Sequence, residues 1–502
     1  MIATKMFKTK FYPVSLNCLF AFILLVSLFT APPPVSAGQT PPSEVDFEAL
    51  DVYIAGQMAK HGIKGVSLAV TSGAEIVYLK GYGTAGDGRP MTPQTPMYFG
   101  SQSKSFTGLA VAQLIEQGKI RLNDPVQQYI PWFRVADEGA SKKITVNHLL
   151  HHTSGLSESG FRAVIPENAS AEEAVRALAS AQLTAPIGTT FQYFNYGYVV
   201  LALIIKEASD QPYEEYVQEH IFDPLEMTNT YTDPALGREN GLSQGYSRFF
   251  GFVMPQGQPH RAYEISEGFI ISTAENMAHY TIARDNAGIY EGNRLLSQAG
   301  MDKLFAPVQG YGMGWSVEPG HVFHGGANET FKTFVDIYPV QDQSIVLLIN
   351  QGYMLDHYIS APQLFKGVEA IVLGNTPPPV SEGWSVKFMG WGLLVFVLGL
   401  SIFQVRNLLS LRGWVDRARS WPAGKKVWDI VLSFLIPTLI LVAVFSGIKA
   451  FFGYRFNLTY HLIHMSRTLG DITILMIVGS VPDYVQGSIK LFWALTGKLR
   501  TW

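Results

Sequence analysis

Two long runs of uncharged residues near the C-terminus constrain the fold of this chain more than any other feature. Each has about the eighteen or more residues that a helix needs to cross the hydrocarbon core of a bilayer. The chain is 47% hydrophobic and only 15% charged, so it is richer in apolar residues than one soluble domain requires. A third apolar run is interrupted by Pro482 and Asp483. We therefore expect a membrane region, residues 388–502, with two to three transmembrane helices at 388–405, 430–448 and about 472–494.

The loop between the first two runs is basic and has few acidic residues. Its six cations are Arg406, Arg412, Arg417, Arg419, Lys425 and Lys426. Loops rich in lysine and arginine stay on the cytoplasmic side of a membrane. The large region before residue 388 is then expected to face outward.

The N-terminus has the three-part layout of a secretory signal. Lysines precede an apolar run, and the run ends in prolines and the small residues Val35, Ser36 and Ala37. Cleavage is expected after Ala37, and an uncleaved signal anchor would leave the domain on the same side. The only cysteine, Cys18, lies in this segment, so the mature chain forms no internal disulfide.

Proline-rich linkers separate these membrane segments from the region between them. We divide the chain into a signal peptide (1–37), a linker (38–44), an exported domain (45–374), a second linker (375–387) and the membrane region (388–502). The predicted protein is a multi-pass protein of the cell membrane, with membrane lipid as a partner and an extracytoplasmic domain.

The exported domain has strand patterns at both of its ends. Helical spacing at 47–62 is followed by two alternating runs typical of a hairpin, 65–72 and 75–83. Short β-rich runs, at 311–318, 321–326, 330–339 and 344–352, precede a closing helix at 361–374. We predict an α+β fold: an antiparallel sheet formed from both ends of the domain, flanked by helices, with an inserted and mostly helical region. A crevice between these two parts is where a substrate would bind.

The charge balance argues against a nucleic-acid partner. The formal net charge is −3, and the sequence has no stripe of lysine and arginine with interleaved aromatic residues.

A serine and a lysine lie three residues apart at the start of an amphipathic segment. Ser101 and Lys104 would share one face of a helix, so the amine can approach the hydroxyl as in an activated acyl-transfer nucleophile. The alternative is a capped helix start with Lys104 in solvent. Ser446 and Lys449 repeat the pattern in an apolar run, so the pattern alone is weak evidence.

Two further patterns follow along the chain. Tyr193 and Asn195 stand just before an apolar helix, and His324 is followed by Gly325 and Gly326 on a predicted strand. Glycines in a strand let another backbone or a ligand approach closely. The alternatives are a buried aromatic residue, a helix cap and a strand residue beside a bulge.

Together these patterns resemble the serine β-lactamase and penicillin-binding protein superfamily. The resemblance is to its class C-like branch, which also contains D-aminopeptidases, carboxypeptidases and esterases, and it covers most of residues 45–374. It is carried by the segments FGSQSKSFT, ITVNHLLHHTSGL, FQYFNYGYVVLALII, GFIISTAENMAHY, NRLLSQAGMDKL and HGG. It implies the β-lactamase/transpeptidase-like fold for the domain.

The resemblance also implies roles for the residues in these motifs. Ser101 would be the nucleophile, and Tyr193 would take its proton and return it to the leaving group. A tyrosine has a reference pKa of about 10, so the charge of Lys104 is needed to favour the phenolate. Asn195 would orient Lys104 and bind the substrate amide. The backbone amides of Ser101 and Ala327 would form the oxyanion hole.

The third motif departs from the family pattern in two ways. His324 stands where classical penicillin binders have lysine, although this branch often has histidine, and we expect His324 and Gly326 to contact substrate. Thr330 stands where a glycine is expected, which leaves the shape of that rim open. No acidic residue can be placed as a deacylation base. The histidines His148, His151 and His152 fit a structural turn rather than a metal site.

The sequence thus predicts a membrane-anchored, outward-facing serine hydrolase or acyl transferase with no metal and no organic cofactor. Its expected substrates are small molecules or peptides: D-amino-acid peptides of the cell wall, related amides or esters, and β-lactams. The alternative is a penicillin-binding or peptide-binding sensor whose acyl-enzyme does not turn over. A transporter is excluded, because two or three spanning helices offer no inverted repeat.

Overall fold

The computed structural model describes residues 45–382, 384–452 and 470–496. Within these residues the chain divides into a large unit that runs to Trp391 and a helical unit that begins at Gly392. The predicted signal peptide and the linker at 38–44 lie outside the described residues.

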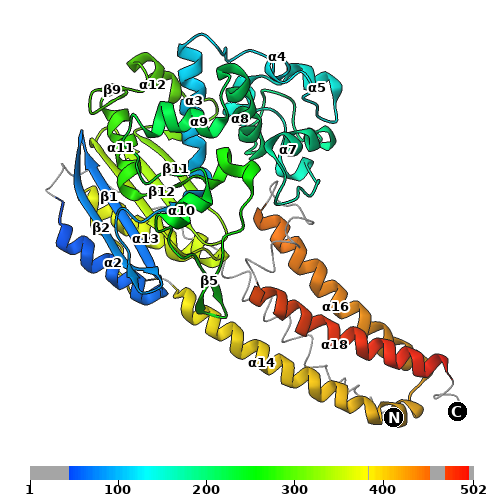
Figure 1. The fold of residues 1–502 in the computed structure, drawn as a ribbon. Coiled ribbons are helices and arrows are strands. Elements are labelled where there is room, and N and C mark those ends of the chain that lie inside the picture. Colours follow the sequence, from blue (N-terminus) through cyan, green and yellow to red (C-terminus); the bar gives the residue numbers. More distant parts are fainter. Residues whose placement is uncertain (1–44, 383, 453–469, 497–502) are drawn as a thin grey trace, which may run out of the picture. The chain divides into compact units, whose positions relative to one another are not determined.

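The large unit is built on a seven-stranded antiparallel sheet (Figure 1). The strand order is β10-β11-β12-β13-β1-β2-β3, with bounds Ser316–Glu318, His321–Ala327, Lys332–Tyr338, Gln343–Ile349, Gly65–Ser72, Glu75–Gly86 and Arg89–Pro90. Strand β1 pairs along its length with β13 and with β2. Strands from the two ends of the domain therefore adjoin at the centre of the sheet, which confirms the predicted antiparallel sheet.

Alternation along β1 explains how both faces of the sheet are covered. Val66, Leu68 and Val70 face a core shared with helices α2 (Phe47–His61) and α13 (Ala361–Val372). The opposite face of β1 carries small side chains, and Ser67, Ala69 and Thr71 are fully buried there. Small side chains let helix α11 pack directly against this face.

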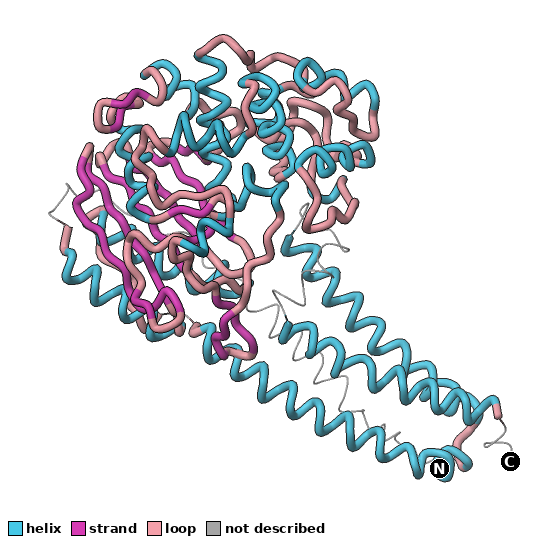
Figure 2. Tube along the Cα trace, in the orientation of Figure 1, coloured by secondary structure: helices cyan, strands magenta, loops and turns pink. Residues whose placement is uncertain are grey.

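The inserted region is mostly helical and shares one continuous core with the second face of the sheet (Figure 2). Helices α3 and α8 form its centre and pack against each other. Its helices are α3 (Ser103–Glu116), α4 (Val126–Tyr129), α5 (Glu138–Lys143), α6 (Val146–Leu150), α7 (Ala171–Ala177), α8 (Tyr196–Ser209), α9 (Tyr213–Val217), α10 (Pro234–Glu239), α11 (Ala274–Asp285) and α12 (Gln298–Leu304).

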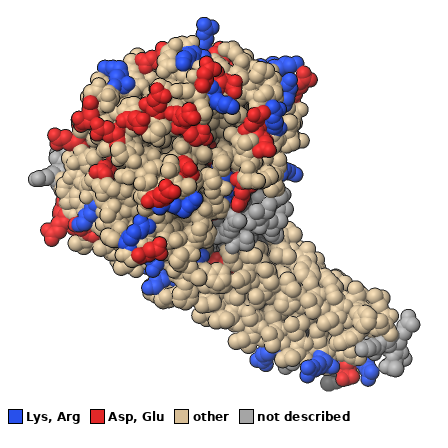
Figure 3. Space-filling view, in the orientation of Figure 1, with Lys and Arg blue, Asp and Glu red and all other residues tan. Residues whose placement is uncertain are grey.

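The helical unit consists of three long apolar helices and one short charged helix among the described residues. They are α14 (Val386–Ser410), whose first residues belong to the large unit, α15 (Trp414–Arg419), α16 (Ala423–Phe452) and α18 (Gly470–Leu495). Figure 3 shows a largely uncharged face along this unit, with lysine and arginine gathered at one end.

One helical stretch among the described residues, Val386–Arg419, meets the length and composition of a membrane span. It contains the first predicted run, 388–405. The second and third predicted runs lie in α16 and α18, and their crossing of a membrane stays a prediction. Helix α18 continues through Pro482, where the sequence indicated an interruption.

Candidate active site

The Ser101 turn is held in place by its neighbour Ser103. The one-turn helix η1 (Gly100–Gln102) leads directly into α3. The Ser103 hydroxyl donates to Gly100 O at 2.8 Å and accepts from the Ile270 amide at 3.1 Å. Ser103 therefore ties the turn to the segment at Ile270, and neither η1 nor α3 has a side-chain cap, while Ser101 remains partly exposed.

Lys104 points inward and is fully buried. Its Nζ lies 3.2 Å from Ser101 Oγ and donates to Asn195 Oδ1 at 2.8 Å. It also donates to the backbone oxygen of Glu267 at 2.7 Å and forms an ion pair with Glu267 Oε2 at 2.9 Å. The lysine predicted to lie beside the serine is thus brought there, and the solvent-exposed alternative is wrong.

The environment of Lys104 keeps it charged. Burial lowers its pKa, but the Glu267 carboxylate and the Tyr193 side chain outweigh burial, and the net pKa is above the usual 10.5. Lys104 is therefore an ammonium at neutral pH. A proton acceptor for the serine must come from another side chain.

Tyr193 lies beside Lys104, with the lysine Nζ 4.9 Å from the centre of its ring. The loop before α8 is fixed by His152, whose Nδ1 accepts from the Phe194 amide at 3.2 Å. The His152 ring packs on the Tyr193 ring at 4.4 Å. Asn195 follows at the start of α8, where its backbone N–H donates to Glu158 Oε1 at 3.1 Å.

Strand β11 approaches the Ser101 turn through its glycines. A Cβ atom on Gly326 would overlap the carbonyl oxygen of Phe99, and one on Gly100 would overlap the amide nitrogen of Ala327. Gly100 also has a φ of 56°, which disfavours other residues. The backbones of Ser101 and Ala327 therefore lie on adjoining segments, as an oxyanion hole requires.

His324 is buried and both of its ring nitrogens are engaged. Nδ1 lies 2.9 Å from Gly325 O, and Nε2 lies 3.0 Å from the Tyr311 hydroxyl. A carbonyl can only accept, so Nδ1 donates to Gly325, and in the neutral imidazole Nε2 then accepts from the Tyr311 hydroxyl. Burial and the neighbouring Tyr198 and Tyr193 raise the pKa of Tyr311 well above 10, which keeps this donor neutral.

Glu267 and Tyr311 are the two site residues that motif reasoning missed. Glu267 belongs to the one-turn helix η6 (Ile265–Phe269) and precedes the segment GFIISTAENMAHY, which carried part of the family resemblance. It is the only charged residue between Glu264 and Glu275. An acid directly before an apolar segment of the family is the signal that could have identified it.

A second charged cluster joins residues before and after the third motif. Buried Arg261 pairs with Glu329 at 2.6 Å and with Glu264 at 3.0 Å. Burial, followed by the Glu267 charge, raises the pKa of Glu264 to about 8. Arg261 is thus already engaged by carboxyl groups.

Thr330 fills the rim position where a glycine was expected. Its hydroxyl donates to Gln258 Oε1 at 2.8 Å, and its amide contacts the same oxygen at 3.2 Å. A Cβ on Gly245 would lie 2.5 Å from this hydroxyl. The threonine therefore ties the rim to the loop that carries Gln258.

The histidines of the segment ITVNHLLHHTSGL contact backbone groups. Nδ1 of His148 accepts from the Thr145 amide at 3.1 Å, and Nδ1 of His151 lies 3.0 Å from Asn147 O. Within the described ranges, no group of three or more histidine, cysteine or acidic side chains could hold a metal ion.

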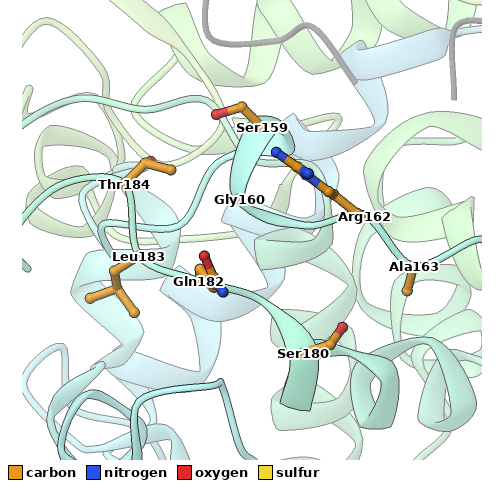
Figure 4. Close-up of a pocket in the computed structure, with 8 residues that line it drawn as sticks. All are labelled: Ser159, Gly160, Arg162, Ala163, Ser180, Gln182, Leu183 and Thr184. Carbon is orange, nitrogen blue, oxygen red and sulfur yellow. The ribbon is translucent and has the colours of Figure 1, made fainter. Parts of the chain in front are cut away.

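A separate surface hollow of about 540 Å³ lies in the helical region (Figure 4). Figure 4 shows Arg162 extending toward Ser159 there. Its lining residues are Ser159, Gly160, Arg162, Ala163, Ser180, Gln182, Leu183 and Thr184. The residues predicted to carry the chemistry are not among them, so we assign no role to this hollow.

Comparison with known proteins defines the class to which this fold and site belong. The family described as Beta-lactamase matches residues 50–364. The chain therefore belongs to the beta-lactamase family. The finer assignment to a class C-like branch stays a prediction.

Relatives from several sources share this region. Protein flp of Staphylococcus aureus is 26% identical over 315 residues, which are 60% of this chain and 63% of flp. An octameric penicillin-binding protein homologue from Pyrococcus abyssi has a TM-score of 0.58 at 26% identity, over 66% of this chain and 78% of its own. EstCE1, a hydrolase with promiscuous acyltransferase activity, has a TM-score of 0.53 at 20% identity, over 65% of this chain and 99% of its own. The last likeness shows the fold alone.

Proposed function

We propose that this protein is a membrane-anchored, extracytoplasmic serine hydrolase or acyltransferase that works through an acyl-enzyme on Ser101. The observation that carries the proposal is the 3.2 Å approach of the buried Lys104 Nζ to Ser101 Oγ. A buried ammonium beside a serine hydroxyl and a tyrosine is an arrangement that activates a nucleophile. Membership of the beta-lactamase family supports the same chemistry.

The proposed reaction has two steps. Ser101 Oγ attacks the substrate carbonyl carbon while Tyr193 takes the serine proton, and the amides of Ser101 and Ala327 bind the developing oxyanion. Tyr193 then returns the proton to the leaving amine or alcohol as its bond to carbon breaks. Water, or another acceptor in acyl transfer, next attacks the ester and releases Ser101.

We propose D-amino-acid peptides, amides or esters as substrates, with weak activity on β-lactams. The hydrogen bond between His324 and the uncharged Tyr311 hydroxyl, and the engagement of Arg261 by Glu329, support this choice. A substrate carboxylate gains little Coulombic attraction from such groups. His324 and Gly326 would contact the substrate from β11, and Asn195 would bind its amide.

Covalent labelling of the full-length protein tests the proposal. A fluorophosphonate should label the native chain, and Ser101→Ala should abolish the label in a folded protein. Ser446→Ala is the matched control, because it removes the serine of the second Ser-x-x-Lys pattern, in α16. Label that persists in folded Ser101→Ala would reject the assignment. Release of acyl product over time separates an enzyme from a sensor that stays acylated.

Protease protection tests the anchoring. Protease added to intact cells should cut the domain before residue 388 and spare the basic loop at 406–426, because its cations resist translocation. Cleavage of that loop from outside would reverse the proposed orientation.

A further inference from the structure

A short hairpin of the large unit exposes an apolar tip. It consists of β5 (Tyr246–Phe249) and β6 (Phe252–Pro255), with Phe249 paired to Phe252 across a two-residue turn. Phe252 and Met254 are 54% and 53% exposed, and Phe249 is 39% exposed. The sequence from 249 to 259 has no ionisable side chain. Hairpin turns in water are usually polar, so a tip of this kind marks a contact surface.

The tip packs against the first turns of α14. Gly251 and Gly390 allow this approach: a Cβ on Gly390 would overlap the Gly251 amide, and one on Gly251 would lie 2.8 Å from Trp391. The Phe252 ring lies 6.2 Å from the Trp391 ring. Residues up to Trp391 belong to the large unit, so the hairpin and the start of the helix lie in one body (Figure 1).

The residues around this contact have the composition of a membrane interface. Trp384 and Phe388 are 74% and 63% exposed, and the Phe388 and Trp391 rings lie 5.4 Å apart. Lys387 Nζ lies 4.9 Å above the Trp391 ring. Aromatic rings with a neighbouring lysine are typical of the zone where a spanning helix enters the bilayer.

We propose that the β5–β6 hairpin tip and the first turns of α14 form one lipid-facing surface, which inserts into the boundary between headgroups and acyl chains of the outer leaflet. If α14 spans the bilayer from Val386, its first turns lie at the boundary between water and lipid. The hairpin contacts those turns, so it lies at the same depth. The inference rests on the membrane anchoring in the proposed function. The hairpin is thus a second attachment of the domain to the bilayer.

Strand β5 of the hairpin is joined to the rim of the candidate site through Arg248. Arg248 forms a buried ion pair with Asp356 at 2.9 Å. The next residue, His357, lies 3.0 Å from the backbone oxygen of Asn328, which follows Ala327. A fixed hairpin therefore holds the domain at a set height and orientation above the lipid.

Site-directed fluorescence on the full chain in lipid nanodiscs tests the proposal. Cys18 is the only cysteine, so Cys18→Ser gives a cysteine-free background. Phe252→Cys, Val340→Cys and Val395→Cys are each labelled with an environment-sensitive NBD group. Val340 is the matched control, because it is 75% exposed in the turn between β12 and β13. Val395 reports on α14 itself.

The expected result is that the label at residue 252 loses about half of its emission to doxyl groups placed in the interface, and the label at 395 loses about half to doxyl groups placed deeper in the acyl chains. The label at 340 loses none to either. Quenching at 395 without quenching at 252 would overturn the hairpin inference and leave the anchoring intact. Absence of quenching at 395 would overturn both.

A second variant guards against misfolding of the first. Met254→Cys places the label two residues further along β6, on the same exposed face as Phe252. This label should also be quenched. Fluorophosphonate labelling of each variant reports whether the domain is folded. An unquenched label at 254 in a folded protein would count against the inference as strongly as one at 252.

Discussion

The two sides of the candidate site are built on opposite electrostatic principles. On one side a buried ammonium, Lys104, is paired with the Glu267 carboxylate and Asn195. On the other side the buried His324 shares a hydrogen bond with the Tyr311 hydroxyl, a group that stays neutral. The charged side lies next to the nucleophile, and the neutral side lies on the strand that leads to Ala327.

This difference separates reactivity from recognition. Charges in a low-dielectric site act strongly on a proton transfer, so they belong beside the serine and the tyrosine. A neutral hydrogen-bonded wall keeps its shape across the pH range in which a free imidazole would change charge. Changes on the charged side should therefore alter turnover and stability, and changes on the neutral side should alter only substrate preference.

The largest effect is expected from Lys104→Met. It removes the ammonium and leaves Glu267 buried without its partner, so kcat/KM should fall roughly a thousandfold and the free energy of unfolding by about 3–5 kcal/mol. Steady-state kinetics and urea unfolding measure the two quantities. The double variant Lys104→Met/Glu267→Gln should recover most of the stability and none of the activity. If Lys104→Met were as stable as the native protein, Lys104 and Glu267 would not be a buried pair of charges.

Tyr193→Phe should be next in size. It removes the hydroxyl proposed as proton acceptor but keeps the ring against His152, so kcat should fall about a hundredfold at nearly constant KM. Ester hydrolysis by the full-length protein gives both constants. Unchanged turnover would show that Lys104, and not Tyr193, accepts the serine proton.

Glu267→Gln should have a smaller effect with a characteristic pH dependence. The amide keeps a hydrogen-bond acceptor near Lys104 but removes the charge that raises the pKa of this lysine, while burial continues to lower it. A lysine whose pKa is raised is charged below that pKa and loses its contribution as the pH rises through it. The alkaline limb of kcat/KM should therefore move to lower pH, with a loss of about tenfold at neutral pH. An unmoved limb would mean that Glu267 does not set the charge of Lys104.

The smallest effect is expected from Tyr311→Phe, on the neutral side. It frees Nε2 of His324, so that the imidazole can take up a proton. KM for a substrate with a carboxylate should then rise about threefold between pH 5 and pH 8, while the native enzyme stays nearly flat. A steep pH dependence in the native enzyme would show that His324 already carries a charge there, and the contrast between the two sides would fail.

The parts of this molecule that were predictable from sequence depend on local periodicity. Strand alternation predicted the hairpin at 65–83 and the sheet assembled from both ends. The three-residue spacing of Ser101 and Lys104 is a property of one helix turn, so their approach needed no knowledge of the rest of the fold.

The parts that were not predictable depend on contacts between distant segments. Glu267 meets Lys104 across 163 positions of the chain, and Tyr311 meets His324 through a turn that brings two segments together. Neither contact leaves a periodic pattern in the sequence. The exposed tip at Phe252 was missed for a different reason, since apolar residues in a short strand usually indicate a core.

The close approach of Gly100 and Gly326 means that the geometry around Ser101 is a property of the main chain. The proposed donors to the oxyanion are amides, which every residue but proline carries. Side chains lining the rest of the crevice can thus be exchanged to suit a new acyl group without disturbing these donors. For protein engineering, the two glycines and Tyr193 mark the positions to leave alone, and the other side chains around His324 mark the ones to randomise.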